Sequence, residues 1–427
     1  MWLWSLTFAA AHVGAPVDAV DAHAVDTDGR VLEASIGVFW TEDGDDWRWV
    51  CHEAVTTETA VITPRYAIAG RRWLVSISRL EETRTLQDAV YWTDDGCTWS
   101  VSEGLTGLEV PEVAIDDTGT VALAVTDNEG TASNFIYRSS DGGQTFSQVL
   151  EVSDQLLTSV VLGPSALGTA IVGGVDTEGQ GWLHWSADHG ETWQSHEVTT
   201  GEVVSMAAHP TDANIGYAVI DGVGVETLLY TADAGESVSV VLDPDGAITD
   251  VEVEPSGGAW LSFSGNAYLY AEDGVTFELV TTGPPGIGVG LHGDLVMLAT
   301  RFELVNDALA EGDRVDGFTQ RFSFFDVDGP LECPEGTHGG DICSPLYPVL
   351  VESLGILDGS EDSGLESGDD GDDGDDGDDD SSDTQAEDPA PNDPTEGEKD
   401  CGCGSEVALL VLPLGLVSFI RRRPGRD

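Results

Sequence analysis

The chain has 427 residues, of which 41% are hydrophobic, and it carries a formal net charge of −63. Its length allows one long β domain or two to three average domains, and its hydrophobic content is sufficient for a packed core. A surface this negative repels phosphate groups, so the composition excludes nucleic acid as a partner. Such a surface fits a strongly hydrated exterior or one that attracts cations.

The first predicted element, residues 1–15, is an export signal. An apolar run from Trp2 ends in the small residues Ala9-Ala10-Ala11, which is typical of a signal-peptide cleavage site. No positive side chain precedes the run, so a buried first strand is the alternative. The signal predicts a secreted protein that folds in an oxidising compartment.

Residues 16–350 repeat a short motif, each time after a β-prone run that carries an aromatic residue near its end. The copies read TEDGDDW from Thr41, TDDGCTW from Thr93, SSDGGQTF from Ser139, SADHGETW from Ser186, TADAGESV from Thr231 and AEDGVTF from Ala271. Hydrophobic strands that are separated by Gly, Asp and Asn turns, at a period of about 45 residues, predict four-stranded propeller blades.

These copies resemble the Asp-box, or BNR, repeat of sialidases, sortilin-type receptors and a photosystem assembly factor. The resemblance covers residues 17–285, and residues 139–146 and 186–193 match the full pattern Ser/Thr-x-Asp-x-Gly-x-Thr-Trp/Phe. The copies at Thr41, Thr93 and Ala271 are one residue shorter, and the copy at Thr231 ends in Val238.

The resemblance implies that each box caps the hairpin between the two outer strands of a blade, away from the central channel where ligands bind. The carboxylate accepts N–H groups of the turn, the glycine tolerates positive φ, and the terminal aromatic side chain packs beneath the hairpin. We therefore expect a structural role for Asp43, Asp95, Asp141, Gly143, Thr145, Phe146, Asp188, Gly190, Thr192, Trp193, Asp233, Gly235 and Asp273.

Residues 286–330 contain three further strand-like runs, GIGVGL, DLVMLATRFEL and FTQRFSFFDVDG, without a box. They are predicted to form a seventh, degenerate blade. The predicted fold class is therefore all-β, a propeller of about seven four-stranded blades, with six blades and a C-terminal cap as the alternative.

Four cysteines of the propeller region are expected to form disulfides. Cys333 and Cys343 bracket a Gly-rich loop, which predicts one bridge between them. Cys51 and Cys97 occupy related points of the repeat, which predicts a second bridge across two blades. A zinc site at Cys51 and His52 is the alternative, although adjacent ligands suit a tetrahedral ion poorly.

Residues 351–400 are predicted to be a disordered linker, because residues 358–400 carry 20 acidic side chains and one lysine. The Asp-Gly rhythm of this linker is compatible with weak, diffuse calcium binding. It lacks the closing glutamate and the hydrophobic positions of defined calcium sites. No other cofactor is expected.

Residues 401–427 resemble the C-terminal sorting tag of myxobacterial surface proteins. Cys401 and Cys403 precede an apolar run, Val407 to Ile420, and a cluster of three arginines follows at once. The run is short for a membrane-spanning helix. The resemblance implies processing at the cysteines and attachment to the bacterial outer membrane or cell envelope.

The predicted function is a non-catalytic binding module of the cell surface, displayed on an acidic stalk, with an extracellular protein or a glycan as partner. A glycoside hydrolase of sialidase type is the alternative, and it needs an arginine triad. Only Arg138 falls between Arg84 and Arg301, and no Arg-Ile-Pro type of motif is present. An extracytoplasmic assembly factor is a further alternative that rests on the shared box alone.

Overall fold

The computed structural model describes residues 19–25, 28–55, 62–79, 90–126, 133–222, 226–244, 246–263, 267–280, 283–284, 286–300 and 308–354. The predicted signal peptide, the predicted linker beyond residue 354, and the predicted tag with Cys401 and Cys403 lie outside these ranges. Among the described residues, no helix has the length and the apolar character needed to cross a membrane.

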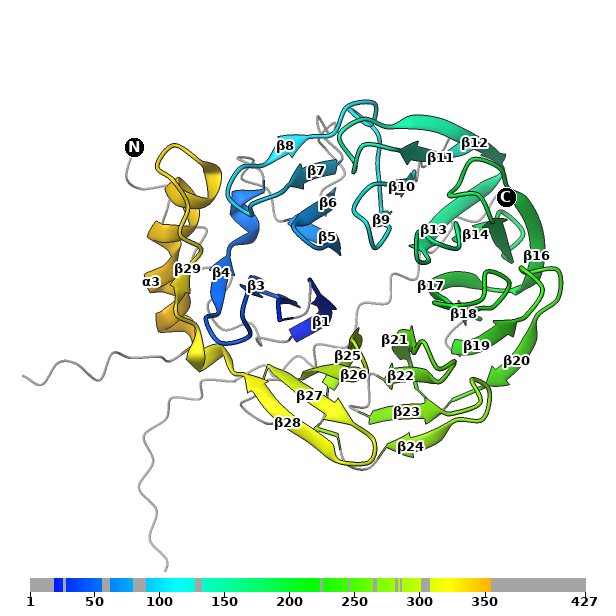
Figure 1. The fold of residues 1–427 in the computed structure, drawn as a ribbon. Helices are drawn as coiled ribbons and strands as arrows, with labels where there is room; N and C mark the ends of the chain where they lie inside the picture. The colour runs from blue at the N-terminus through cyan, green and yellow to red at the C-terminus, as the bar shows by residue number, and fades with distance from the viewer. Residues whose placement is uncertain are drawn as a thin grey trace, which may run out of the picture. The chain divides into compact units, whose positions relative to one another are not determined.

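The described residues form a seven-bladed β-propeller, which confirms the predicted fold class (Figure 1). Each blade is an antiparallel sheet whose strands pair in sequence order, from an inner strand beside the centre to an outer strand at the rim.

The first three blades hold twelve strands. Blade 1 comprises β1 (Ala19–Ala24), β2 (Arg30–Ala34), β3 (Gly37–Thr41) and β4 (Arg48–Val50). Blade 2 comprises β5 (Ile62–Ala69), β6 (Arg72–Arg79), β7 (Val90–Thr93) and β8 (Ser100–Val101). Blade 3 comprises β9 (Glu112–Ile115), β10 (Ala122–Val125), β11 (Ser133–Ser139) and β12 (Ser147–Ser153).

The other four blades continue the same order around the ring. Blade 4 comprises β13 (Gln155–Leu162), β14 (Ala170–Asp176), β15 (Gln180–Ser186) and β16 (Gln194–Thr200). Blade 5 comprises β17 (Glu202–Ala208), β18 (Gly216–Asp221), β19 (Glu226–Thr231) and β20 (Ser239–Leu242). Blade 6 comprises β21 (Ile248–Val253), β22 (Ala259–Phe263), β23 (Ala267–Ala271) and β24 (Glu278–Val280). Blade 7 comprises β25 (Gly286–His292), β26 (Leu295–Thr300), β27 (Leu309–Asp313) and β28 (Gly317–Phe322).

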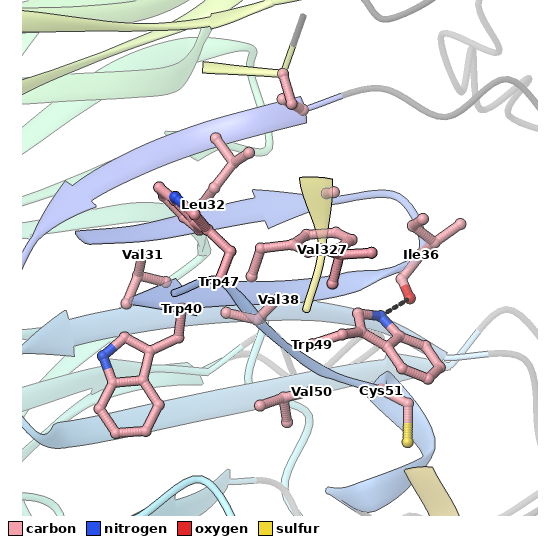
Figure 2. Close-up of a cluster of buried hydrophobic side chains, with 14 of the residues drawn as sticks. Val31, Leu32, Ile36, Val38, Trp40, Trp47, Trp49, Val50, Cys51 and Val327 are labelled. Atoms are coloured by element: carbon pink, nitrogen blue, oxygen red, sulfur yellow. Dashed lines mark hydrogen bonds between the residues drawn. The ribbon is translucent and has the colours of Figure 1, made fainter. Parts of the chain in front are cut away.

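Apolar side chains fill the interfaces between neighbouring blades. Successive side chains of a strand point to opposite faces of its sheet, so Trp73 and Val75 of β6 join the cluster around blade 1, whereas Leu74 joins the cluster shared with blade 3. Strands β3, β10 and β22 are buried throughout, because both faces of each blade are covered. Figure 2 shows the cluster at blade 1, where the Trp49 indole N–H donates to the Ile36 carbonyl at 3.0 Å.

The ring closes between blade 7 and blade 1 by close backbone approach. A Cβ atom on Gly290 of β25 would lie 1.9 Å from the Ala22 carbonyl oxygen of β1, and one on Gly288 would lie 2.2 Å from that of Val20. Further out, Arg30 of β2 binds the buried carboxylate of Glu311 on β27 at 3.0 Å. The glycines of β25 thus allow blades 7 and 1 to approach closely, and the ion pair links the two blades.

The chain then returns to the outside of blade 1. After the 3₁₀ turn η2 (Phe324–Asp326), strand β29 (Gly329–Pro330) pairs in parallel with β4 as a fifth strand of this blade. A π-helical turn η3 (Gly339–Cys343) leads into helix α3 (Ser344–Ser353), which extends past the predicted domain end at residue 350. Helix α3 lies outside blade 1 in Figure 1.

The predicted disulfide pairing is wrong, although all four cysteines are bonded. The bridges are Cys51–Cys343 and Cys97–Cys333, each with a Cα–Cα distance of 5.4 Å. The C-terminal segment runs along blades 1 and 2, and this path brings residues distant in sequence beside Cys51 and Cys97. Because Cys51 is bonded to Cys343, the alternative of a zinc site at Cys51 and His52 is also wrong.

Candidate functional site

The antiparallel order of the strands gives the ring two different faces. One face carries the turns from the first to the second strand and from the third to the fourth strand of each blade, and we call it the box face. The opposite face carries the connections between blades and the turns from the second to the third strand, and we call it the crossover face. The inner strands start at the crossover face, so their first residues surround the axis of the ring there. We call the region around this axis the channel, and its end at the crossover face the crossover mouth.

The six predicted box aspartates lie in the turns between the third and fourth strands of blades 1 to 6, on the box face. In blade 4, Asp188 Oδ1 accepts the Thr192 N–H at 2.8 Å and the Ser186 hydroxyl at 2.8 Å, and Oδ2 accepts the Thr192 hydroxyl at 2.6 Å. Corresponding N–H groups bond to Asp43, Asp95, Asp141, Asp233 and Asp273.

These hydrogen bonds set the charge state of the turn. Burial by itself would raise the pKa of Asp188, but the bonds from Thr192 and Ser186 outweigh it and lower the pKa. The pKa values of the other five box aspartates are lowered by the same kind of bond. The carboxylates are thus engaged within separate turns at the rim, and the structure does not bring them together into one site.

The other box residues position the turn against the neighbouring blade. Gly143 and Gly190 have φ values of 83° and 80°, and a Cβ atom on either would collide with a leucine of the preceding blade. Phe146 is buried, and Trp193 packs against the cluster between blades 3 and 4. Thr145, Thr192 and Gly235 occupy the expected turn positions.

The two histidines near the blade 4 box do not converge. His184 is buried, with Nδ1 2.8 Å from the Ser195 hydroxyl and Nε2 2.9 Å from the Gln155 amide oxygen. Burial lowers the pKa of His184 to about 4, so the ring stays neutral. His189 lies in the box turn itself with φ 60°. The structure therefore places the two histidines in separate environments, one in the buried part of β15 and one in the turn after it.

A repeated bulge marks the crossover mouth of the channel, and no sequence motif predicted it. Five inner strands skip one residue in their pairing with the second strand, always near the strand start. Each skipped residue is exposed or half-buried, whereas the residue before it is buried. Bulges re-aim side chains and are frequent beside binding sites. The skipped residues are Val20, Thr158, Val204, Thr249 and Ile287.

A cluster of Asp21, His23 and Glu33 follows the bulge of blade 1, and we call it the channel triad. Asp21 pairs directly with Glu33 across β1 and β2. His23 Nε2 lies 2.9 Å from Glu33 Oε1 and 3.4 Å from Asp21 Oδ2, and the three side chains are 14% to 34% exposed. Burial would lower the pKa of His23, but Asp21, the bond to Glu33 and the charge of Glu252 raise it to about 10.

Further acidic residues lie on the inner strands of blades 3 and 6. Glu112 Oε2 accepts the N–H of Val160 on the next blade at 3.1 Å, and burial raises its pKa to about 7. Asp250 Oδ2 likewise accepts the Val289 N–H at 3.0 Å, and burial with the charge of Asp21 raises its pKa well above the usual range. The pKa of Glu252 rises to about 7, first through burial and then through Asp21. Each raised pKa reflects the free-energy cost of burying a negative charge, which for Asp250 and Glu252 includes repulsion by Asp21, and a bound cation would lower that cost.

The described arginines are spread over the molecule and do not meet in the channel. Arg65 of β5 is the one described arginine on an inner strand, and its charge acts on both Glu33 and Glu112. Other described arginines bind acidic partners elsewhere, such as Arg72 with Asp94, Arg138 with Glu191 and Arg314 with Glu272. Arg84 and Arg301 lie outside the described ranges. Within those ranges no arginine triad of sialidase type is formed.

Sequence reasoning missed the channel triad. The available signal was the alternation of Asp21 and His23 in AVDAHA, followed by a turn sequence and a second strand with Glu33. Reading that stretch as an inner hairpin places all three side chains on one face. Asp250 and Glu252 had no comparable signal, because ring closure alone brings blade 6 within reach of blade 1.

Comparisons with known proteins support the fold. No family model matches the sequence, and no curated protein matches it. Solved structures do match, all at low identity. A puromycin-hydrolysing peptidase of Mycobacterium tuberculosis is 12% identical with a TM-score of 0.51, over 77% of this chain and 56% of that chain.

Two further structures align over most of their own length. The hydrazine synthase of Kuenenia stuttgartiensis is 11% identical with a TM-score of 0.50, over 69% of this chain and 95% of that chain. YCF48 bound to D1 peptide is 16% identical with a TM-score of 0.46, over 67% of this chain and 89% of that chain. At these identities the likeness to the peptidase and to the hydrazine synthase shows the β-propeller fold alone.

Proposed function

We propose that this protein is a non-catalytic binding module of the bacterial cell surface, which captures a basic segment of an extracellular protein at the crossover mouth of its channel. The observation that carries the proposal is the composition of that mouth. Skipped residues of five blades surround a channel whose inner strands carry Asp21, Glu112, Asp250 and Glu252 but, among the described residues, a single arginine, Arg65.

Apolar and acidic groups at the mouth supply complementary parts of such recognition. Val20 and Val204 are each 39% exposed despite their size, and an apolar contact there removes this surface from water. Lys and Arg side chains combine an apolar stem with a charged head, so a basic peptide satisfies both features. The negative potential of the whole chain also accelerates the approach of a basic partner.

Cell-surface display rests on the sequence. The export signal in residues 1–15, the acidic stalk in residues 351–400 and the sorting tag in residues 401–427 occur in the order that a displayed domain requires. We expect Cys401→Ala/Cys403→Ala to leave the chain unanchored. Fractionation of the culture should then find the variant in the medium and the parent chain with the cells. Protease treatment of intact cells should digest the parent chain, because it lies on the cell surface. Equal amounts of protease-accessible chain on the cells in both cases would contradict the role of the tag.

Peptide binding by the full chain tests the binding proposal. Immobilised peptides of equal length that are rich in Lys/Arg, rich in Asp/Glu or neutral should be bound in that preference, with Lys/Arg first. Binding should weaken with salt, because mobile ions screen the attraction. Val204→Arg places a repelling charge at the mouth and should weaken binding of the basic peptide about tenfold, or about 1.4 kcal/mol.

Val240→Arg is the matched control, because Val240 lies on β20 of the same blade, at the rim, and is 62% exposed. It should bind the basic peptide as the parent chain does. Equal losses in both variants, equal binding of all three peptides, or retention of glycans alone would each refute capture of a basic segment at the mouth.

A further inference from the structure

We propose that the channel triad is a metal site, in which Asp21, His23 and Glu33 bind a first-row divalent transition ion such as Zn²⁺. The proposal goes beyond peptide capture and does not depend on it. The ligand atoms of these three described residues all lie within 4.8 Å of one another.

The geometry of the triad matches the needs of such an ion. Ligand atoms about 2.1 Å from a tetrahedral Zn²⁺ lie about 3.4 Å from one another. His23 Nε2 is 2.9 Å from Glu33 Oε1 and 3.4 Å from Asp21 Oδ2, so small side-chain movements convert the cluster into a coordination shell. One imidazole nitrogen with two carboxylates favours Zn²⁺ and its neighbours over Ca²⁺, which prefers oxygen ligands alone.

The backbone around the triad keeps the ligands in place. Asp21 Oδ1 accepts the N–H of Ala22 at 2.7 Å, which leaves Oδ2 directed at His23. Strand pairing of Asp21 with Glu33 fixes both carboxylates on one side of the hairpin. Such secondary contacts orient the ligands of natural metal sites.

A buried hydroxyl without a hydrogen-bond partner lies within electrostatic reach of Glu33. Tyr66 of β5 packs against the blade 1 cluster, and its hydroxyl oxygen is buried without a hydrogen-bond partner in the described structure. Burial, followed by the charges of Glu33 and Glu53, raises the pKa of Tyr66. A buried hydroxyl without a partner costs free energy, and a metal-bound water beside Glu33 would supply the partner.

The carboxyl groups around the triad would also be stabilised by a bound cation. The carboxyl group of Asp21 lies within electrostatic reach of those of Glu33, Asp250 and Glu252. Among the described residues, His23 bonds to Asp21 and Glu33, and the charge of Arg65 also acts on Glu33. A divalent ion supplies two positive charges where the imidazolium supplies one. Binding would release the His23 proton to the buffer, because the nitrogen must be deprotonated to coordinate the metal.

Titration of the full chain with Zn²⁺ tests the site. Excess Mg²⁺ in every arm occupies diffuse carboxylate sites, including those of residues 358–400. We expect one saturable Zn²⁺ per chain, a rise of the melting temperature with Zn²⁺, and visible absorption bands of bound Co²⁺. His23→Gln and Glu33→Gln should each weaken Zn²⁺ binding at least about tenfold, because even the loss of a group that only orients a ligand costs about 10–100-fold in metal affinity.

His189→Gln is the matched control, because it removes a histidine from a carboxylate-bearing turn on the box face. It should bind Zn²⁺ as the parent chain does. If His23→Gln fails to fold, Glu33→Gln and the Co²⁺ spectrum of the parent chain decide. The absence of saturable binding in the parent chain, or equal binding in the parent, His23→Gln and Glu33→Gln chains, would overturn the proposal. Peptide capture, tested with Val204→Arg, would be unaffected by either result.

Discussion

In each eight-residue box the position after the aspartate has positive φ, which strains the backbone unless the residue there is glycine. The position after the aspartate has φ values of 69°, 60° and 58° in Gly142, His189 and Ala234. For an L residue the left-handed region costs about 1–2 kcal/mol, whereas glycine adopts it freely. We therefore expect Ala234→Gly to raise the free energy of unfolding by about 0.5 kcal/mol, after the entropy that glycine adds to the unfolded chain is subtracted.

Ala232→Gly is the control for this effect, because Ala232 lies two residues earlier in the same turn and does not have positive φ. It should lower the free energy of unfolding by about 0.5 kcal/mol. Urea unfolding of both variants measures the difference. A lower midpoint for Ala234→Gly than for Ala232→Gly would show that the turn does not strain Ala234.

The residues that sequence reasoning found are those whose partners are local. Asp188 bonds to groups within four residues of itself, so a short motif contains its whole environment. The environment of Asp21 includes Glu252, more than 200 residues away, and no short pattern encodes that pairing.

At the scale of the strand, two glycines of β25 control the closure of the ring. Gly290 has ordinary negative φ, so its requirement is the approach of the Ala22 carbonyl rather than turn geometry. A methyl group 1.9 Å from a backbone oxygen cannot be relieved by a side-chain rotation. Gly290→Ala should therefore lower the free energy of unfolding by at least about 2 kcal/mol, measured by thermal or urea unfolding.

Gly246→Ala is the control for Gly290→Ala, since its added Cβ meets nothing within 4 Å. Gly246→Ala should leave the free energy of unfolding unchanged. An equal free energy of unfolding for the two variants would mean that the contact between Gly290 and Ala22 does not require glycine.

The strands were predictable and the disulfides were not, for one physical reason. Alternating and continuous apolar runs report the burial of each strand within its own blade. Disulfide pairing depends on the path of the C-terminal segment, which brings Cys343 to Cys51 across 292 residues and Cys333 to Cys97 across 236 residues. The short loop between Cys333 and Cys343, and the related repeat positions of Cys51 and Cys97, therefore predicted the wrong pairs.

At the scale of the whole molecule, the channel and the rim respond to pH in opposite directions. Burial raises the pKa of Glu112 to about 7, above its value of about 4.3 in an unfolded chain. The folded state thus binds this proton more tightly, so its contribution to stability grows as pH falls from 7 towards 4.3 and is lost above 7. The box aspartates have lowered pKa values, so their contribution is present above about pH 3.9 and is lost below it.

The melting temperature should therefore be highest near pH 5 and fall on both sides, with the net charge adding self-repulsion at higher pH. Glu112→Gln keeps an oxygen for the Val160 N–H but removes the titration, so it should reduce the difference in melting temperature between pH 5 and pH 8. Glu151→Gln, on the exposed strand β12 of the same blade, removes one charge without a buried proton and should retain that difference. A melting temperature that rises steadily from pH 5 to pH 8, or an equal response of the two variants, would place the pH sensitivity of the propeller outside its channel.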